Sequence, residues 1–339
     1  MRSDSEYMKT EYYSPSGALS YRTIANATLY WAVVYGLVRL WWTVTGSRPD
    51  LPPTGDDLTV FSDWGIIALC VATVVCAWQL RSRASVGYPR LLLVASLMVS
   101  VLIIVSAVLL LLDVVGLLLL GGSGIPLHPL SFATRVSAAV MAIGLFAATW
   151  RAYRRWIADC DDCGRRSATA PAWTEIPQWA FVAAYAAMAA YVTRVLVQFP
   201  FEGPGGISDS DLVALGVLAS GAGILLPLAL VYPFGRIWPS WVPRLAGRAV
   251  PRRLVLIPAV VISVGMNVYF GMNFGGLLLF GTDVFESTYP DWFWWSSVGS
   301  YVVWGLALLA VTYAYARRTR PLCELCQRRL FLEGTVRVG

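Results

Sequence analysis

Long apolar segments recur along nearly the whole chain, and they limit what it can fold into. Eight segments are continuously apolar rather than alternating: 24–45, 58–80, 91–112, 132–150, 177–199, 212–233, 254–280 and 292–316. A helix of about 20 residues crosses the roughly 30 Å hydrocarbon layer of a bilayer. Lipid cannot satisfy the backbone of an open sheet, so such segments must be helical. The sequence therefore predicts an all-α membrane protein with eight transmembrane helices.

The composition agrees with this class. Hydrophobic residues make up 57% of the 339 residues and charged residues only 14%, whereas soluble domains have about 25% charged residues. Residues 1–23 are mostly polar and aromatic and lack the charged, apolar and small-residue order of a secretory signal. We interpret them as a cytoplasmic N-terminal segment.

Arginine predicts the orientation. The loops on the side of the N-terminus carry nearly all of the cationic residues, whereas the four opposite loops hold only Arg48 and Arg135. The positive-inside rule therefore predicts a multi-pass protein of the cell membrane with both termini in the cytoplasm. The formal net charge of +6 follows from this topology, so it gives no support to nucleic-acid binding.

One phrase occurs twice, which indicates a duplicated chain. "TWRAYRRWIADCDDCGRR" begins at Thr149 and "TYAYARRTRPLCELCQRR" at Thr312, each at the end of the fourth helix of its half. Because each half has an even number of helices, the two copies run in the same direction, as a parallel 4+4 repeat with a pseudo-twofold axis along the membrane normal. The predicted repeats are 24–166 and 167–329, followed by a C-terminal tail, 330–339.

Each copy of the phrase carries a CxxC pair. Thiols stay reduced in the cytoplasm, and two CxxC turns supply four thiolates for a tetrahedral zinc ion. We predict one structural zinc that clasps the two halves; redox dithiols and solvent-facing cysteines remain open as alternatives. Cys70 and Cys76 are interpreted as small buried residues of the second helix. The predicted zinc ligands are Cys160, Cys163, Cys323 and Cys326.

Ionisable residues inside spans are costly and therefore point to candidate sites. Each half places an arginine near the outer end of its first helix, an aspartate at the start of its second, and an acid or amide late in its third. The functional interpretation is an outward-facing vestibule that attracts an anionic group; the structural one is snorkelling arginines and ion pairs. The candidate ligand-binding residues are Arg39, Arg194, Asp63, Asp211, Asp113 and Asn273.

The sequence gives little support for a known catalytic or nucleotide-binding motif. The chain has a single histidine, His128, in an outer loop, and no GxSxG, Walker or GxGxxG sequence stands in a suitable context. The tryptophans near helix ends are typical of interfacial belts, with a site for lipid or another amphiphile as the alternative.

Two segments carry a resemblance to other proteins. "YWAVVYGLVRLWW" (Tyr30 to Trp42) and "WPSWVPRLAGRAVPRR" (Trp238 to Arg253), with the endings of the fourth and eighth helices, resemble uncharacterised polytopic integral membrane proteins of high-GC actinobacteria. The resemblance covers most of the chain and implies the same polytopic architecture. That family has no established activity, so the resemblance implies no residue roles.

These features predict a transporter or permease for a small anionic or amphiphilic solute, because parallel repeats with polar residues near a pseudo-axis are typical of transporters. A non-catalytic membrane scaffold or subunit with a protein partner is the first alternative. A membrane enzyme that uses Asp63, Asp113 and Asp211 as acid and base is the second. Lipids and a small-molecule ligand are the expected partners, and zinc is the expected cofactor.

Overall fold

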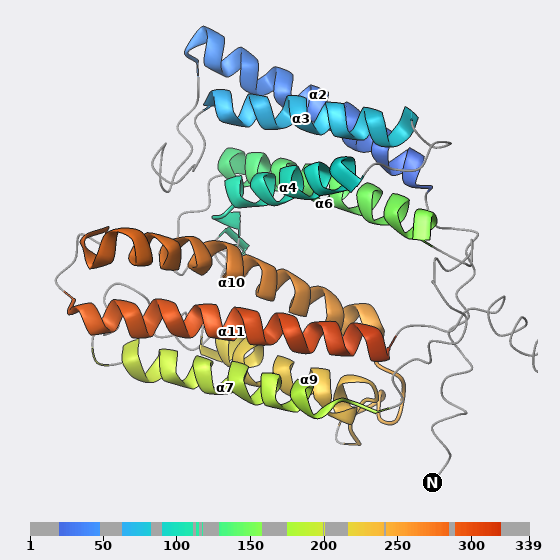
Figure 1. Ribbon diagram of the computed structural model, residues 1–339. Helices are drawn as coiled ribbons and strands as arrows, with labels where there is room; N and C mark the ends of the chain where they lie inside the picture. Colours follow the sequence, from blue (N-terminus) through green and yellow to red (C-terminus); the bar gives the residue numbers. More distant parts are fainter. Residues whose placement is uncertain are drawn as a thin grey trace, which may run out of the picture. The chain divides into compact units, whose positions relative to one another are not determined.

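The computed structural model describes residues 20–47, 63–82, 90–110, 113–114, 117, 129–157, 175–198, 200, 216–240, 242–284 and 289–319. Helices dominate this part of the chain (Figure 1). The extended pairing within it is one isolated bridge, between Ile237 and Ala249. The prediction of an all-α membrane protein is therefore confirmed at the level of fold class.

The helices of the first half form one compact unit. In this unit, α2 packs against α3 and α6, and α4 packs against α3 and α6. Ser20 begins α2 by accepting a hydrogen bond from the Thr23 amide, and Gly46 ends it with a left-handed φ of 64°. The helices are α2 (Tyr21–Thr45), α3 (Asp63–Ser82), α4 (Arg90–Ser106) and α6 (Pro129–Ile157).

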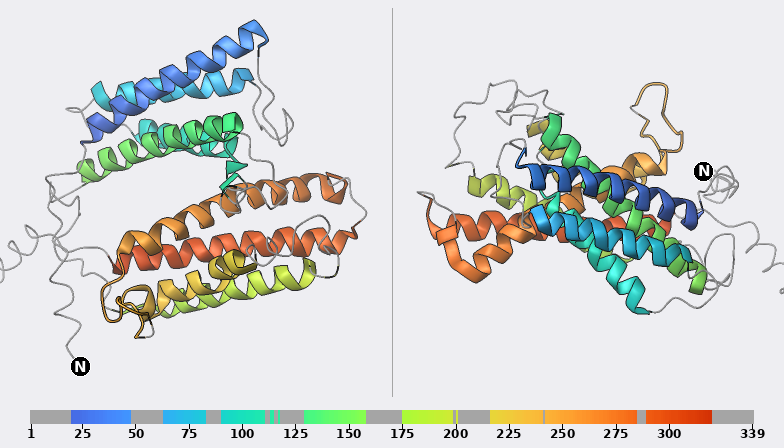
Figure 2. Two further views of the ribbon diagram at one scale, coloured as in Figure 1. Left: turned by 180° about the vertical axis from the view of Figure 1, so that it is seen from behind. Right: turned by 90° about the horizontal axis from the view of Figure 1, so that it is seen from above.

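The helices of the second half form the other unit. Its long helices α7 and α11 pack along each other, α10 packs on α11, and a broken helix packs beside α7 (Figure 2). The broken helix covers 216–231 and includes a π-helical turn. The elements are α7 (Gln178–Gln198), η2 (Gly221–Leu225), α9 (Leu226–Val231), η3 (Pro233–Gly235), α10 (Arg252–Phe280), η4 (Gly281–Val284) and α11 (Asp291–Arg318).

Five of the described helices are long and apolar enough to cross a membrane: Asp63–Ser82, Pro129–Arg154, Gln178–Gln198, Arg252–Phe280 and Asp291–Arg318. Each coincides with one of the eight predicted segments. The helix α4 has 17 residues, which gives about 26 Å at 1.5 Å per residue, and 216–231 is also short. The helix α2 has 25 residues but is not among the five. Eight spans and the 4+4 repeat therefore remain predictions.

Apolar side chains cover the outside of both units. Leu91, Val182 and Leu279 are among many large hydrophobic residues that are more than half exposed in the isolated chain. Such a surface is unfavourable in water but suits contact with lipid tails. The structure is that of a membrane-embedded, multi-pass protein.

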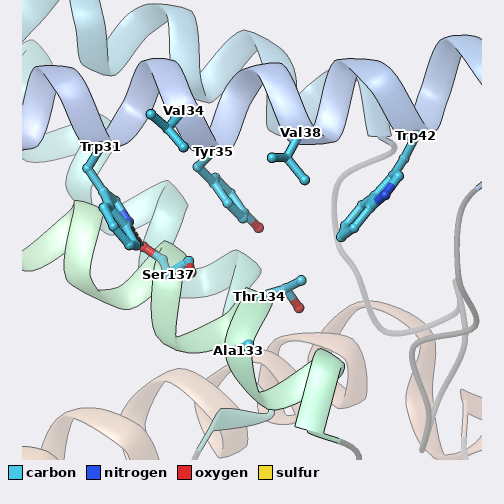
Figure 3. Close-up of a pocket in the computed structure, with 8 residues that line it drawn as sticks. All are labelled: Trp31, Val34, Tyr35, Val38, Trp42, Ala133, Thr134 and Ser137. Atoms are coloured by element: carbon cyan, nitrogen blue, oxygen red, sulfur yellow. Dashed lines mark hydrogen bonds between the residues drawn. The ribbon is translucent and has the colours of Figure 1, made fainter.

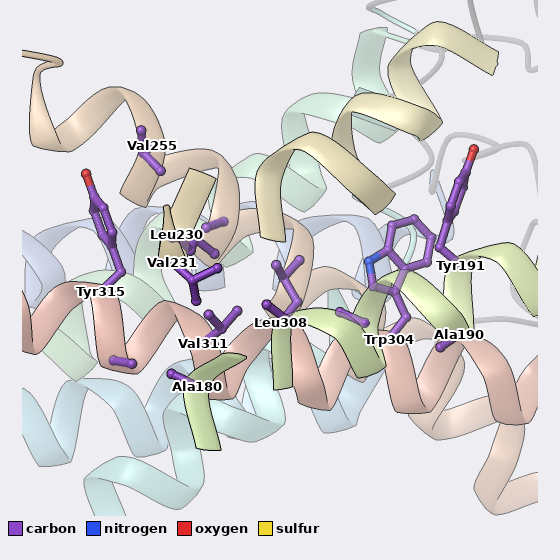
Figure 4. Packing of buried hydrophobic residues seen from close by; sticks show 14 of the residues in the cluster. Ala180, Ala190, Tyr191, Leu230, Val231, Val255, Trp304, Leu308, Val311 and Tyr315 are labelled. Atoms are coloured by element: carbon purple, nitrogen blue, oxygen red, sulfur yellow. The ribbon is translucent and has the colours of Figure 1, made fainter. Parts of the chain in front are cut away.

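Small residues bring the helices of the second unit together. Ala180, Ala184 and Ala187 are fully buried on one face of α7, at the spacing that a helix needs to present a flat contact surface. They pack in one cluster with Leu308 and Val311 of α11 (Figure 4). Small residues let membrane helices approach closely, and dispersion then replaces the hydrophobic effect as the source of stability.

Candidate functional site

The arginine of the first half is paired. Arg39 lies in the penultimate turn of α2 and Asp63 is the first residue of α3. The Arg39 Nη2 donates to Asp63 Oδ1 over 2.8 Å, and the two side chains are 3% and 22% exposed. The Arg39 Cζ also lies 6.0 Å from the ring centroid of Trp42. This arrangement neutralises the buried guanidinium and ties the end of α2 to the start of α3.

The arginine of the second half has a different environment. Arg194 lies in α7, one turn before its end, and is 7% exposed. Its Nε and Nη1 have no hydrogen-bond partner, and no carboxylate of the described residues pairs with it. The Arg194 Cζ lies 4.6 Å from the ring centroid of Tyr301 on α11. A buried cation is therefore held over an aromatic face with two of its three nitrogens unused.

Aromatic rings continue from that face. Tyr301 stacks on Phe270 of α10 with centroids 3.6 Å apart and on Trp304 with centroids 6.1 Å apart. Trp304 also meets Tyr191 of α7 edge to face at 5.2 Å. We refer to Tyr191, Arg194, Phe270, Tyr301 and Trp304 as the Arg194 cluster. It joins three helices of one unit.

Trp304 adds a third unused donor nitrogen to the cluster. Its side chain is 5% exposed, and its Nε1 has no hydrogen-bond partner. In Figure 4 the indole nitrogen of Trp304 points away from Tyr191. Buried indole N–H groups normally find an acceptor. Two neighbouring side chains of this unit thus keep buried donors without an acceptor.

A π-helical turn borders the cluster. The Tyr191 hydroxyl lies 3.0 Å from the Ser220 Oγ, one residue before η2. Gly223, inside η2, faces the Tyr191 ring so closely that a Cβ there would overlap its Cγ. Short π-helical turns interrupt α-helices by one inserted residue and occur often at functional sites. Here the turn makes room for the tyrosine that packs on Trp304.

The remaining candidates give a mixed result. Asp113 is buried, at 3% exposure, in the short described stretch 113–114. Asn273 is half-buried, and its Nδ2 donates to the Tyr269 carbonyl of its own helix over 2.8 Å. Of the six candidate ligand-binding residues, Arg39 and Asp63 are the two that the structure brings into contact within the described part of the chain. Six further residues lie outside the described part: Asp211, His128, Cys160, Cys163, Cys323 and Cys326.

The described residues contain no group of three or more His, Cys, Asp or Glu side chains suited to a metal ion. The predicted zinc ligands all lie outside these residues, so this observation does not bear on them. Cys70 and Cys76 are buried and free, as interpreted from the sequence.

A shallow cavity of about 170 Å³ lies between α2 and α6 in the first unit. Figure 3 shows Tyr35 extending from α2 towards α6, with Trp31 and Trp42 at the two ends. The Trp31 Nε1 donates to the Ser137 carbonyl over 3.2 Å. The other lining residues are Val34, Val38, Ala133 and Thr134.

Sequence reasoning did not identify this cavity or the aromatic part of the Arg194 cluster. A signal was present in both cases. Trp31, Tyr35, Val38 and Trp42 follow the spacing of one helical face, and Tyr191 precedes Arg194 by three residues, the spacing of side-chain neighbours on a helix. The aromatic partners of Arg194 come from α11, more than 100 residues later, which no local pattern shows.

No family model, no curated protein and no solved structure matches this chain.

Proposed function

We propose that the chain is a membrane carrier for a small anionic or amphiphilic solute, and that Arg194 is the group that binds its anionic part. The observation that carries this proposal is the buried Arg194 guanidinium, with Nε and Nη1 unused. Buried polar groups in proteins are nearly always hydrogen-bonded. A ligand that accepts from these groups is therefore the natural complement of the site.

The chemistry of the cluster supports an anion with an apolar body. Guanidinium N–H groups form their strongest hydrogen bonds with carboxylate, phosphate or sulfonate oxygens. The rings of Tyr191, Tyr301 and Trp304 make the surroundings of the charge apolar, and the Trp304 Nε1 is one more donor. A small carboxylate with an aliphatic or aromatic portion uses all of these features.

The two halves are proposed to have diverged in this respect. Arg39 is neutralised by Asp63, whereas no carboxylate of the described residues pairs with Arg194. We assign a structural role to Arg39 and a ligand-binding role to Arg194. The sequence predicted ligand-binding residues in both halves. We propose that the ligand-binding site lies in the second half alone.

The proposed duplication is supported by helix pairing. The first helix packs against the last in both units (α2 on α6, α7 on α11), and the third packs against the last in both (α4 on α6, α10 on α11). The second helix packs against the first in both as well. Parallel repeats of this kind are common in transporters, where they move against each other around a central site. We also propose that the four cysteines of the two CxxC turns bind one structural zinc ion.

Ligand-induced thermal stabilisation of purified protein tests the binding step and needs no assumption about which solute is carried. A panel of small carboxylates, phosphates and sulfonates is compared with matched neutral amides and alcohols. We expect at least one anion to raise the melting temperature of the wild type, and the Arg194→Lys variant to lose that shift, because lysine lacks the planar donor fork.

Three variants sharpen the test. Arg39→Lys is the matched control and should keep the shift, while Tyr301→Leu should reduce it and Tyr301→Phe should retain it. No stabilisation of the wild type by any anion, or an unchanged shift in Arg194→Lys, would reject Arg194 as the binding group. Flux of the active anion into proteoliposomes then distinguishes a carrier from a scaffold, since binding without flux contradicts transport.

A further inference from the structure

The loop between α9 and α10 forms a folded, basic surface at one end of the second unit. The loop and the first turn of α10 carry five arginines, namely Arg236, Arg244, Arg248, Arg252 and Arg253, and residues 212–282 contain no aspartate or glutamate. The loop begins after η3 and ends where α10, a helix long and apolar enough to cross a membrane, begins. Its charge is therefore concentrated next to the headgroup layer.

Backbone hydrogen bonds hold this loop in a defined shape. The Trp238 amide donates to the Arg248 carbonyl over 2.9 Å, and the Gly247 amide donates to the Trp238 carbonyl over 3.0 Å. The Val250 amide closes the base of the loop on the Arg236 carbonyl over 2.7 Å. In the right-hand view of Figure 2 the loop, drawn in gold, stands out to one side of the helices of its unit.

Both ends of the loop are fastened to α11. The Tyr315 hydroxyl donates to the Gly235 carbonyl over 3.0 Å. Arg252 donates through Nε to the Thr319 hydroxyl over 3.0 Å and through Nη2 to the Ala316 carbonyl over 2.9 Å. Arg252 thus caps the carboxyl end of α11, where a cation is favourable. This arginine has a structural role, and the loop it anchors cannot swing freely.

Three of the other arginines are presented outwards. Arg244, Arg248 and Arg253 are exposed, and no acidic side chain of the described residues engages them. Arg244 has a φ of 67°, the single left-handed non-glycine residue in the described part of the chain. A side chain other than glycine or asparagine is rare in this conformation and costs stability.

Apolar side chains accompany the charges. Leu245 is 36% exposed, and Trp238 and Val242 are half-buried. Tryptophan favours the boundary between headgroups and acyl chains. Arginines interleaved with tryptophan and leucine, next to the ends of membrane helices, match a surface that holds anionic headgroups while apolar side chains enter the boundary.

We propose that the loop 236–253 binds the phosphate headgroups of anionic lipids, with Arg244, Arg248 and Arg253 as the contacting residues. This site is separate from the Arg194 cluster and does not depend on the proposed transport function. Its consequence is a preference of the protein for an anionic leaflet on the side of this loop.

Native mass spectrometry of the full chain in neutral detergent measures this binding. Phosphatidylglycerol is titrated against phosphatidylcholine of the same chain length. We expect tighter binding of phosphatidylglycerol to the wild type, and about fivefold weaker binding for each arginine removed, the effect of one basic side chain near an anionic surface. The variants are Arg244→Gly, which suits the φ of 67°, and the Arg248→Ala, Arg253→Ala pair.

A matched control removes the same charge elsewhere. Arg81→Ala with Arg90→Ala acts at the predicted cytoplasmic ends of α3 and α4 in the other unit and should weaken phosphatidylglycerol binding less than the Arg248→Ala, Arg253→Ala pair does. Equal affinity of the wild type for both lipids, or an equal loss in the control, would overturn the proposal. Glycerol phosphate provides the last comparison: if it binds as tightly as the lipid and with the same arginine dependence, the partner is a soluble phosphate and not a membrane lipid.

Discussion

The guanidinium of Arg39 reaches the carboxylate of Asp63 across 2.8 Å and thereby closes the end of α2 onto the start of α3. Arg39 is almost fully buried, while Asp63 keeps some exposure. Removing one partner of such a pair leaves a charge without compensation, whereas removing both leaves no charge to bury. The pair therefore makes a specific prediction about stability.

The variant Arg39→Leu should lose about 2 kcal/mol of unfolding free energy, less than for a fully buried pair because Asp63 is partly hydrated. Arg39→Leu combined with Asp63→Leu should recover part of that loss. Apparent melting temperatures of the wild type, both single variants and the double variant in one detergent measure the coupling. Additive losses in the double variant would contradict a stabilising ion pair.

The close approach of Gly223 to Tyr191 gives a second prediction. A methyl group at position 223 would overlap the Cγ at the root of the ring, which cannot rotate away. We expect Gly223→Ala to cost about 2 kcal/mol, as overpacked cores do. Gly216→Ala is the control, because open space surrounds that position and alanine favours helix. Equal melting temperatures for both variants would show that η2 shifts to accommodate the methyl group without a loss of stability.

The predicted zinc site has a direct elemental test. Purified protein should contain about one zinc per chain if two CxxC turns complete a four-thiolate site. The Cys160→Ser and Cys323→Ser double variant should lose the metal, because each turn loses one ligand. Cys76→Ala should keep it, since Cys76 is buried within α3. Zinc absent from the wild type, or undiminished in the double variant, would exclude the clasp.

The arginine distribution predicts which cysteines a reagent outside the cell can reach. In intact cells, an impermeant thiol reagent should label a cysteine introduced at Gly55 and should miss Cys160 and Cys323. After the cells are opened and bound metal is removed with a chelator, those two cysteines should become reactive. Labelling of Cys160 or Cys323 in unbroken cells would invert the proposed topology.

The sequence predicted elements that depend on local composition. Continuous apolar runs predicted the helices from Asp63, Gln178 and Asp291, because hydropathy over about 20 residues determines whether a segment enters a membrane. Within the third segment, the helix α4 ends at Ser106 and a turn follows at 107–109. Hydropathy does not report where a helix loses its hydrogen-bond pattern.

The surroundings of the two arginines show the limit more clearly. Arg39 and Asp63 were expected at one membrane level from their places at the end and start of successive helices, and the structure brings them together. Arg194, at the equivalent position in the second half, lies over the ring of Tyr301 of α11. That contact depends on how α7 and α11 pack, which is a tertiary property. The hydropathy pattern also did not predict the π-helical turn at Gly223, because one inserted residue leaves the hydropathy of the segment unchanged.

The guanidinium of Arg194 is also a charge inside an electric field. An empty carrier that moved an unbalanced Arg194 across the membrane would move one positive charge. The field acts on such a step with up to about 2.3 kcal/mol per 100 mV. A monovalent anion bound to Arg194 would cancel that charge. The transition of the anion-bound carrier would then be independent of the membrane potential. The membrane potential would then affect the rate at which the empty carrier returns. The charge of the solute would determine whether the empty or the loaded transition moves net charge across the membrane.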